Sequence, residues 1–289
     1  IEEQLISSFE VPDEAASVSV SLDRVSVPME EPRVRPTGRP RKNAPKRPVE
    51  RNYRMAYCGT VTLHDAEGES LHTIRYGCMP QSSQEALVTS MAGDVVALRQ
   101  QTPELSVTLL CDGAAEMWNL LEAEFDEPEV FGKVHRLIDY WHLVEKLSPA
   151  AKVLDPEGAN AIMKRWKLRL LNCNSAAGEI LEDLLASEKE HVVVGTSEPV
   201  HEAITYIENN GDRMMYAGAR RRGLPIGSGN VEATCKTLVR QRMDRAGCRW
   251  KNDTGDHVLH LRALSLSDRW DDAMDITLRV TPPRIQVAA

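Results

Sequence analysis

The stretch Leu105-Ser-Val-Thr-Leu-Leu-Cys-Asp112-Gly113 is an almost unbroken apolar run that stops at an acid followed by glycine. Apolar runs without polar alternation are typical of strands buried on both faces of a sheet, so this segment predicts a central strand. Ligands collect beyond the carboxyl ends of such strands, which makes Asp112 a candidate site residue. The alternative, that Asp112 and Gly113 only turn the chain, stays open.

Upstream of this segment the sequence predicts three strands and a helix. Apolar and small polar residues alternate from Val18 to Asp23, where the first strand is expected to end, and Val25 and Val27 can extend it to Pro28. Two more strand-like segments flank the turn-forming residues 65–68, which predicts a hairpin. Helical spacing follows, with Ser82 or Ser83 as N-cap. The predicted ranges are 55–64 and 70–76 for the strands and 83–101 for the helix.

Downstream the sequence predicts a helix over 114–125, a strand over 133–139, and mainly helices from Tyr140 to Arg222 with a break near 192–199. A last helix over 254–265 precedes a frayed tail after Trp270. Three hairpin-linked strands followed by strands reached through helices predict a mixed α/β sheet with helices on both faces. The expected division is a core over 1–147 with a mobile basic loop at 33–54, a helical insertion over 148–222, the rest of the core over 223–270, and a tail over 271–289.

The segment from Gly223 to Trp250 is the second informative stretch. It begins as a glycine- and proline-rich loop, and it continues as a helix whose apolar residues fall at i, i+4 and i+7. Glu232 lies in the first turn, with Lys236 and Arg240 following it along the helix. One interpretation is an acid held rigidly among basic groups. The other is that Glu232 favours the helix dipole and the basic residues form a solvated face. The loop residues are Pro225, Gly227 and Gly229, and the apolar ones are Val231, Cys235 and Leu238.

Charge and cysteine content limit the possible partners and compartment. The net charge is −8, yet residues 33–54 hold nine Lys/Arg against one acid and residues 213–251 hold ten against two. Such local concentration indicates a polyanion binder. The six cysteines show no C-x-x-C spacing, which favours core thiols in a reducing compartment over a zinc site or disulfides. Without an apolar run of membrane-spanning length, the chain is expected in the cytoplasm.

Three acids, Asp23, Asp112 and Glu232, therefore stand out. Carboxylates that converge in one site repel each other unless they share a cation. Two Mg²⁺ or Mn²⁺ ions roughly 3.5–4 Å apart would satisfy oxygen ligands and activate a nucleophilic oxygen. Asp23 can equally be an ordinary strand-end acid, so each residue alone is weak support.

Several motifs resemble the DDE transposases of ISKra-type bacterial insertion sequences. The resemblance extends from about Val18 to Trp270, and its most specific part is Gly-Ser-Gly-x-Val-Glu232. It implies a ribonuclease-H-like fold with a five-stranded mixed sheet, interrupted by a helical insertion before the acid-bearing helix. The motifs are Asp112-Gly-Ala114, Asp139-Tyr-Trp-His142-Leu-Val-Glu-Lys-Leu147, Pro225-Ile-Gly-Ser-Gly-Asn-Val-Glu232-Ala-Thr-Cys-Lys236, Gly247-Cys-Arg-Trp250, Leu261-Arg-Ala-Leu264 and Ser267-Asp-Arg-Trp270.

Carried over by position, the catalytic and metal-binding residues are Asp23, Asp112 and Glu232, although the match around Asp23 is short and lacks the usual aspartate-glycine step. Asp139 and His142 resemble an acid-x-x-His signature and are either accessory to DNA binding or a buried structural pair. The implied partners are double-stranded DNA, as element ends and target, and further copies of the chain, in a bacterial nucleoid and without a membrane. Because the chain begins at Ile1 and lacks an N-terminal recognition domain, we expect a fragment. The predicted DNA contacts are Arg39, Arg41, Lys42, Lys46, Arg47, Arg220, Arg221, Arg222, Lys236 and Arg240.

Three other functions compete with transposition. Gly227-Ser-Gly229 before a helix could bind a nucleotide phosphate, although it lacks the P-loop lysine and Glu232 would repel the phosphate. A catalytically inactive DNA-binding remnant and a ribonuclease-H-like nuclease are the remaining alternatives. The transposase hypothesis predicts that Asp23 and Asp112 lie on adjacent strands, with Glu232 on the same face of the sheet.

Overall fold

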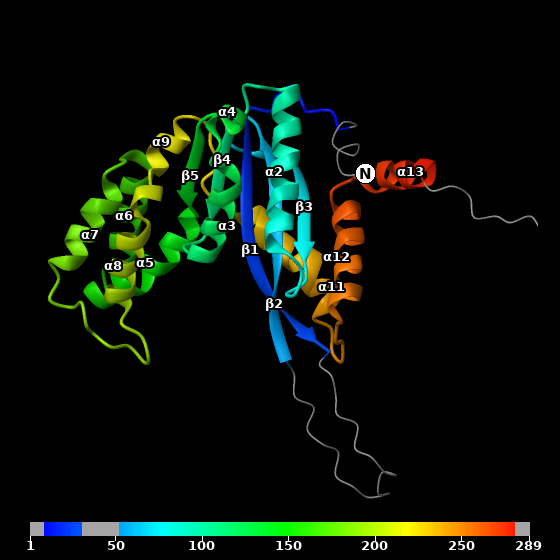
Figure 1. Cartoon of the computed structure of the whole chain (residues 1–289). Coiled ribbons are helices and arrows are strands. Elements are labelled where there is room, and N and C mark those ends of the chain that lie inside the picture. The colour runs from blue at the N-terminus through cyan, green and yellow to red at the C-terminus, as the bar shows by residue number, and fades with distance from the viewer. Residues whose placement is uncertain (1–8, 31–51, 281–289) are drawn as a thin grey trace, which may run out of the picture.

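The computed structural model describes residues 9–30 and 52–280, and its centre is a five-stranded sheet with the order β3-β2-β1-β4-β5. β1 is antiparallel to β2, and β2 is antiparallel to β3, whereas β4 is parallel to both β1 and β5. The predicted mixed α/β sheet of the ribonuclease-H-like class is confirmed (Figure 1). The strands are β1 Ser17–Met29, β2 Asn52–His64, β3 Ser70–Cys78, β4 Ser106–Cys111 and β5 Val134–Ile138.

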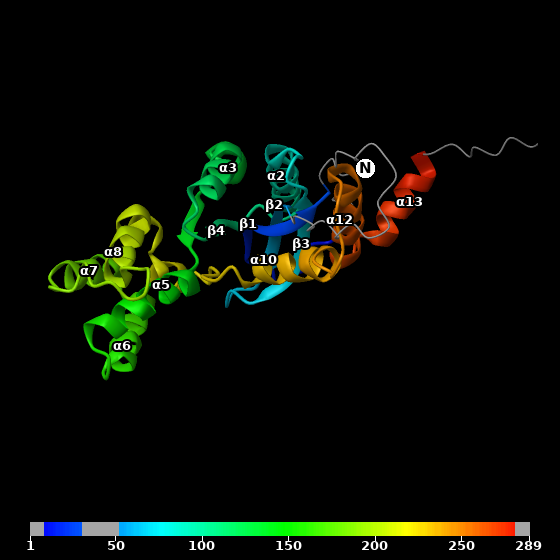
Figure 2. The same ribbon diagram turned by 90° about the horizontal axis from the view of Figure 1, so that it is seen from below.

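Helices cover both faces of the sheet (Figure 2). On one face lie α2 Gln84–Gln101, which Ser83 caps as predicted, α3 Ala115–Phe125 and the short α4 Pro128–Phe131, which the sequence pattern does not predict. On the other face lies the acid-bearing segment, followed by α12 beside β3. That segment consists of α10 Gly229–Thr234, a π-helical turn Cys235–Arg240 and α11 Gln241–Met243, and α12 spans Asn252–Leu266.

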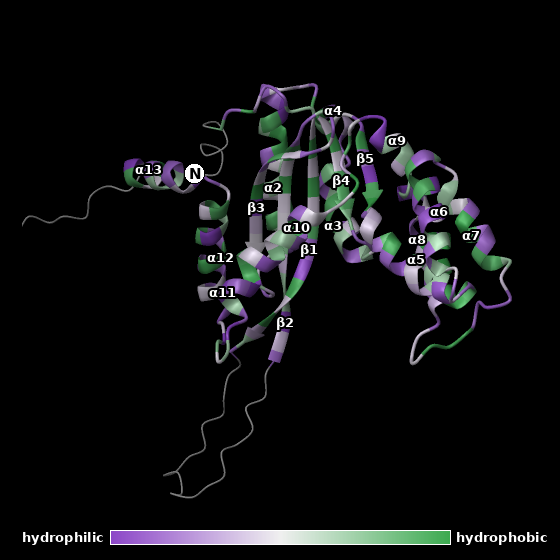
Figure 3. Ribbon diagram, turned by 180° about the vertical axis from the view of Figure 1, so that it is seen from behind, coloured by the Kyte–Doolittle hydropathy of each residue, from purple (hydrophilic) through white to green (hydrophobic). Residues whose placement is uncertain are grey.

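The apolar core follows this layering. Leu22, Leu109 and Met91 belong to the cluster between the sheet and α2, whereas Val25, Leu238 and Leu259 belong to the cluster between the sheet and the acid-bearing segment. The hydrophobic colour in Figure 3 accordingly runs through the strands at the centre of the sheet. Val231, Cys235 and Leu238, the predicted apolar stripe, are all buried.

Between β5 and α10 the chain forms a group of helices beside the sheet (Figure 1). Their interior includes Trp166, Ile180 and Ile207, which are part of the same apolar cluster as the central strands. α5 continues across residue 147, where the sequence places the start of the insertion. The helices are α5 Tyr140–Leu154, α6 Ala159–Asn172, α7 Ala176–Leu185, α8 Pro199–Asn210 and α9 Tyr216–Arg220, with a 3₁₀ turn at Gly211–Arg213.

β1 takes the longer of its two predicted extents, because Val25 and Val27 continue the pairing with β2 past Asp23 as far as Met29. One sequence prediction needs correction. The chain after Trp270 is not a frayed tail, because Trp270–Val280 forms α13. This helix has acids in its first turn and Arg279 in its last, which complements the helix dipole, and its buried Ala273 lies at 2% exposure.

The π-helical turn after Glu232 has a specific partner in α12. Arg262 donates from Nε to the Leu238 carbonyl oxygen at 3.0 Å and from Nη2 to the Thr237 carbonyl oxygen at 2.5 Å. A π turn disturbs the regular carbonyl pairing of a helix, and a guanidinium can satisfy two such carbonyls at once. Arg262 therefore holds the widened turn that follows the acid.

His64 is a buried histidine at the end of β2, only 3% exposed. Its Nδ1 lies 3.1 Å from the Gly68 carbonyl oxygen and its Nε2 lies 2.8 Å from Ser19 Oγ, so a neutral ring that donates from Nδ1 and accepts at Nε2 satisfies both contacts. Burial lowers the pKa of His64 to about 4, although the Gly68 carbonyl and Asp65 act in the opposite direction.

This lowered pKa predicts acid destabilisation. The unfolded chain binds a proton near the ordinary histidine pKa whereas the folded chain does not, so stability present above about pH 6.5 is lost as the pH falls towards 4. We expect a loss of about 3 kcal/mol over that interval. Urea denaturation at pH 7 and pH 4.5 measures it. His64→Gln should flatten the dependence, whereas His260→Gln, at an exposed histidine, should keep it; equal pH dependence in the parent and His64→Gln would contradict this assignment.

Candidate active site

Three acids lie on or directly after the neighbouring strands β1, β4 and β5: Asp23, Asp112 and Asp139. The parallel register pairs Ser17 with Ser106 and Val20 with Leu109, and continuing it pairs Asp23 with Asp112. The register of β4 and β5 pairs Cys111 with Ile138, and its next step pairs Asp112 with Asp139. Two contacts show that the strands remain adjacent there: the Leu22 amide donates to Cys111 Sγ at 3.2 Å, and the Asp139 amide donates to the Cys111 carbonyl at 2.8 Å.

Asp23 faces the side of the sheet that carries the acid-bearing segment. The thiol of Cys235 donates to Asp23 Oδ2 at 3.4 Å, whereas the next residue, Arg24, points to the opposite face and pairs with Glu116 of α3. A hydrogen bond with Cys58, burial and the nearby Asp23 carboxylate all raise the pKa of Cys235, so the thiol keeps its proton as donor. Because Cys235 follows Glu232 by one turn, this contact ties the helix of the third acid to the strand of the first.

Asp112 is half-buried where β4 meets α3. Its Oδ1 accepts from the Ala114 amide at 3.0 Å, so the turn-forming role considered for this residue is present. Oδ2 accepts no hydrogen bond from any residue of the described chain and is available to a cation. Gly113 is tightly covered by Tyr206 of α8, because a Cβ at this position would lie 2.6 Å from the tyrosine ring. Helix α8 thus fixes the turn that presents Asp112.

Glu232 is exposed in the first turn of α10. Its carboxylate and ligand atoms of Asp139 and His142 all lie within 4.8 Å of one another. Carboxylate oxygens suit Mg²⁺ or Mn²⁺, and an imidazole is tolerated better by Mn²⁺. Among the described residues, the group of potential ligands around Glu232 consists of Asp139 and His142 and does not include Asp112 or Asp23.

Asp139 is fully buried and uses both carboxylate oxygens within the protein. Oδ1 accepts from the amides of Trp141 at 2.6 Å and His142 at 3.0 Å, which caps α5, while Oδ2 accepts from the amide and hydroxyl of Ser228. Burial alone would raise the pKa of Asp139, but the interaction with the His142 side chain, the hydrogen bonds from Ser228 and the His142 amide outweigh it and lower the pKa to about 2. Asp139 thus connects β5 and α5 to the residue that precedes α10.

His142 lies between the acids. Its Nδ1 is 3.5 Å from Asp139 Oδ1, longer than a good hydrogen bond but within ion-pair range. Asp139 raises the pKa of His142 to about 9 despite partial burial, and Asp112 and Glu232 add to this effect. The Asp112 and Glu232 carboxylates therefore help to keep the His142 ring protonated at neutral pH, and the ring places a positive charge near these acids.

The hydrogen bonds of Ser228 argue against the alternative that this loop binds a nucleotide phosphate. A phosphate bound at Gly227-Ser-Gly229 would need the free amide and hydroxyl donors of this loop. The Ser228 donors are both engaged by Asp139, and Ser228 is only 4% exposed. In this structure the loop anchors the acid-bearing helix and offers no phosphate cradle at Ser228.

The predicted DNA-contacting residues fall in three groups. Arg220, Arg221 and Arg222 are exposed at the C-terminal end of α9. Arg222 lines a cavity of about 320 Å³ with Lys133 and Arg213 next to β5. Lys236 and Arg240 are exposed on the segment that follows Glu232. The remaining five, Arg39, Arg41, Lys42, Lys46 and Arg47, lie outside the described residues.

Sequence reasoning missed three residues that shape the site. Ser228 and Arg262 each lie inside a motif quoted above, but only the fold shows which groups they meet. Trp141 is 56% exposed beside the site and covers Gly227, where a Cβ would lie 3.1 Å from its ring. A tryptophan between a buried acid and a histidine was the available signal, because exposed tryptophans are uncommon unless a partner uses them.

Comparison with family models and with curated protein sequences gives no match. Among solved structures, the chain is similar to the Drosophila P element transposase strand transfer complex, with 11% identity over 96% of this chain and 74% of that chain. The TM-score is 0.34. The fold class assigned above therefore rests on the strand order and pairing of this chain itself. Among the described helices, none has the length and apolar character needed to cross a membrane.

Proposed function

We propose that this chain is the catalytic region of a DDE transposase, of the ISKra type that its motifs resemble, which cleaves and joins DNA strands. The observation that carries the proposal is the placement of the acids. β1 and β4 are adjacent and parallel, and their register, continued beyond Val20 and Leu109, would bring Asp23 beside Asp112. The helix of Glu232 packs on the face to which Asp23 points, through Cys235. These residues lie far apart in the sequence, and the fold brings the elements that carry them to neighbouring positions on the sheet.

Each residue has a distinct task in this proposal. Asp112 and Glu232 supply free carboxylate oxygens, and Asp23 adds a third carboxylate to the pair of Mg²⁺ or Mn²⁺ ions that they would hold. When bound, such ions supply activation of the attacking oxygen and stabilisation of the leaving one. Asp139 and Ser228 position α10, and His142 balances the acidic charge where a DNA phosphate would approach.

DNA is the proposed partner because exposed basic residues flank Glu232 in the sequence. Arginines 220–222 and the pair Lys236 and Arg240 offer phosphate contacts on either side of Glu232 in the sequence. The exposed ring of Trp141 offers a stacking surface for an unpaired base. We further propose binding to element ends and target DNA as a homo-oligomer in the bacterial nucleoid.

Nicking of supercoiled plasmid, and joining of oligonucleotides with free 3′-hydroxyl ends to it, tests this proposal. We expect both activities in Mg²⁺ or Mn²⁺ and neither in a chelator. Nicking without joining would favour the ribonuclease-H-like nuclease. DNA binding without either reaction would favour the inactive remnant.

The three arginines at the C-terminal end of α9 should bind DNA phosphates through their charge alone. Replacing Arg220, Arg221 and Arg222 by glutamine should weaken binding to all DNA sequences alike, and each lost phosphate contact should reduce the slope of log K against log salt by about 0.9. Fluorescence anisotropy across a salt series measures both effects. The matched control replaces three exposed basic residues of α5 and α6, Lys152, Lys164 and Arg165. A loss confined to particular DNA sequences would show that these arginines read bases.

A further inference from the structure

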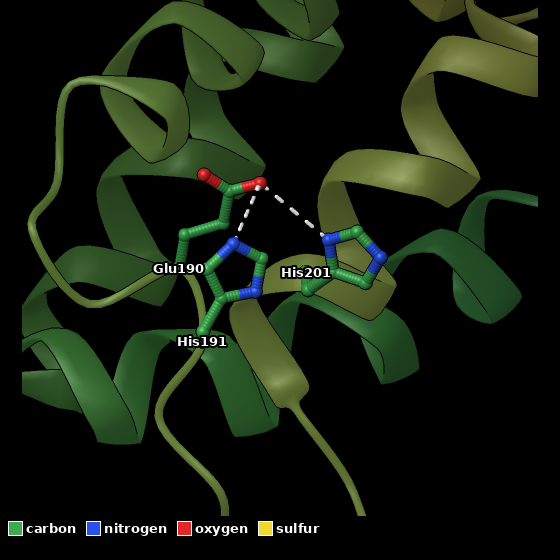
Figure 4. Close-up of side chains that lie close together, drawn as sticks. All are labelled: Glu190, His191 and His201. Atoms are coloured by element: carbon green, nitrogen blue, oxygen red, sulfur yellow. Dashed lines mark ion pairs between the residues drawn. The ribbon is translucent and has the colours of Figure 1, made fainter.

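A second group of potential metal ligands lies in the helical region, in the loop between α7 and the start of α8. Glu190 stands between two histidines, His191 and His201, and their ligand atoms all lie within 4.8 Å of one another (Figure 4). Glu190 Oε1 is 3.5 Å from His201 Nδ1 and 3.9 Å from His191 Nε2. In a tetrahedral zinc site with bonds of about 2.0–2.1 Å, neighbouring ligand atoms are about 3.3 Å apart, so small side-chain rotations suffice.

A fourth residue orients one of the histidines. Glu198 Oε2 is 3.2 Å from His191 Nδ1, the ring nitrogen that faces away from Glu190. Histidines that bind metals usually donate their second ring N–H to a carboxylate, which fixes the tautomer and raises the basicity of the ligating nitrogen. In the tautomer that donates from Nδ1 to Glu198, His191 Nε2 keeps a lone pair that can bind a metal beside the Glu190 carboxylate.

The loop is built to bring these residues together. The ammonium of Lys189 donates to the carbonyls of Val153 and Leu154 at the end of α5, which anchors the entry of the loop. Val194 and Ser197 exchange two backbone hydrogen bonds and reverse the chain. The reversal places His191 opposite Glu198, and His201 follows in the first turn of α8. Residues from both arms of the loop thus meet at one point without a metal.

We propose that Glu190, His191 and His201 bind one Zn²⁺ ion, with water in the fourth position and Glu198 supporting His191. Two imidazoles and one carboxylate suit zinc and exclude Mg²⁺, which prefers oxygen ligands. The ion joins the two arms of the loop and leaves the exposed residues Val192, Val193 and Val194 at its tip. This site is separate from the acids on the sheet and does not depend on the function proposed for them.

Equilibrium dialysis of the whole chain against Zn²⁺, after removal of metals with a chelator, tests the site. The parent should bind one equivalent of Zn²⁺, and millimolar Mg²⁺ should not displace it. His201→Ala and Glu190→Gln should lose this equivalent. Glu198→Gln should bind it about 10–100-fold more weakly. Glu232→Gln and His260→Gln should retain it. The first separates this site from the Asp139–His142–Glu232 group, and the second is the control for an exposed histidine outside the cluster.

Two readouts report the ligands and the structural effect. Co²⁺ in place of Zn²⁺ should give the visible bands of a tetrahedral nitrogen and oxygen site, without the charge-transfer band of thiolates such as the exposed Cys173. Elastase accepts small aliphatic side chains and should cleave the loop at Val192–Val194. Zinc should slow this cleavage in the parent, whereas the cleavage rate of His201→Ala should be the same with and without zinc. Zinc bound equally by the parent and His201→Ala, or a thiolate spectrum, would overturn the proposal.

Discussion

Asp112→Asn should abolish strand cleavage and joining while leaving the protein folded and bound to DNA. The asparagine Oδ1 can still accept from the Ala114 amide, so the turn is retained, but the negative charge that holds a cation is lost. A bound cation contributes several kcal/mol of transition-state stabilisation, which corresponds to roughly 10³-fold in rate. Plasmid nicking in Mg²⁺ or Mn²⁺ measures the activity, and fluorescence anisotropy measures the affinity for DNA.

Affinity for DNA should stay within a few-fold of the parent, because the phosphate contacts come from basic residues. It can even increase, since one carboxylate fewer repels the DNA backbone. Glu232→Gln should behave in the same way. Asp155→Asn is the matched control: Asp155 Oδ1 accepts from the Glu157 and Gly158 amides in a similar turn, far from the acids on the sheet. If Asp112→Asn and Glu232→Gln cleave like the parent, the catalytic site lies elsewhere.

The sheet could be predicted from the sequence because its strands carry strong local signals. The apolar run ending at Asp112 is β4, and the turn residues between β2 and β3 form the expected hairpin. The offset between paired residues of β1 and β4 could not be predicted, since register depends on how both strands pack against α2 and α3. Only that offset, continued beyond Val20 and Leu109, would bring Asp23 beside Asp112. The catalytic roles of both acids remain a prediction.

Elements that depend on partners far along the chain were missed. The pattern of α13 is too polar to signal a helix, and it is stabilised by end charges and by packing against α12. The π-helical turn depends on Arg262, which is 22 or more residues beyond it. The zinc ligands were missed because Glu190, His191 and His201 match no common spacing, and only the chain reversal at Val194 and Ser197 brings them together.

Asp139→Asn should misplace the acid-bearing helix and destabilise the fold. Asparagine is a good N-cap, so its Oδ1 can retain the bonds from Trp141 and His142. Its amide nitrogen, however, would face the Ser228 amide, so two donors would oppose each other in a buried place. Losing charge-assisted bonds and leaving a buried donor unsatisfied costs about 3–5 kcal/mol in unfolding free energy. Urea denaturation at neutral pH measures this loss.

Ser228→Ala gives the graded comparison. It removes the hydroxyl bond to Asp139 but keeps the backbone amide bond, so the expected loss is only about 1 kcal/mol. Asp94, which binds Arg269 in another buried pair, supplies the control: Asp94→Asn should also destabilise the fold, but it lies on α2, across the sheet from Glu232. Of these variants, Asp139→Asn should lower cleavage most, well beyond what its loss of folded protein explains, and Ser228→Ala should lower it less.

The decisive measurement is Mn²⁺ affinity of folded protein, followed by cleavage rate at saturating Mn²⁺. If Asp139 positions Glu232 through Ser228, both the Mn²⁺ affinity and the cleavage rate should be highest in the parent, lower in Ser228→Ala and lowest in Asp139→Asn. Asp94→Asn should match the parent in both once compared at equal folded concentration. Parent-like Mn²⁺ affinity and cleavage in folded Asp139→Asn would show that this acid only caps α5, because the cap is the one contact that asparagine preserves.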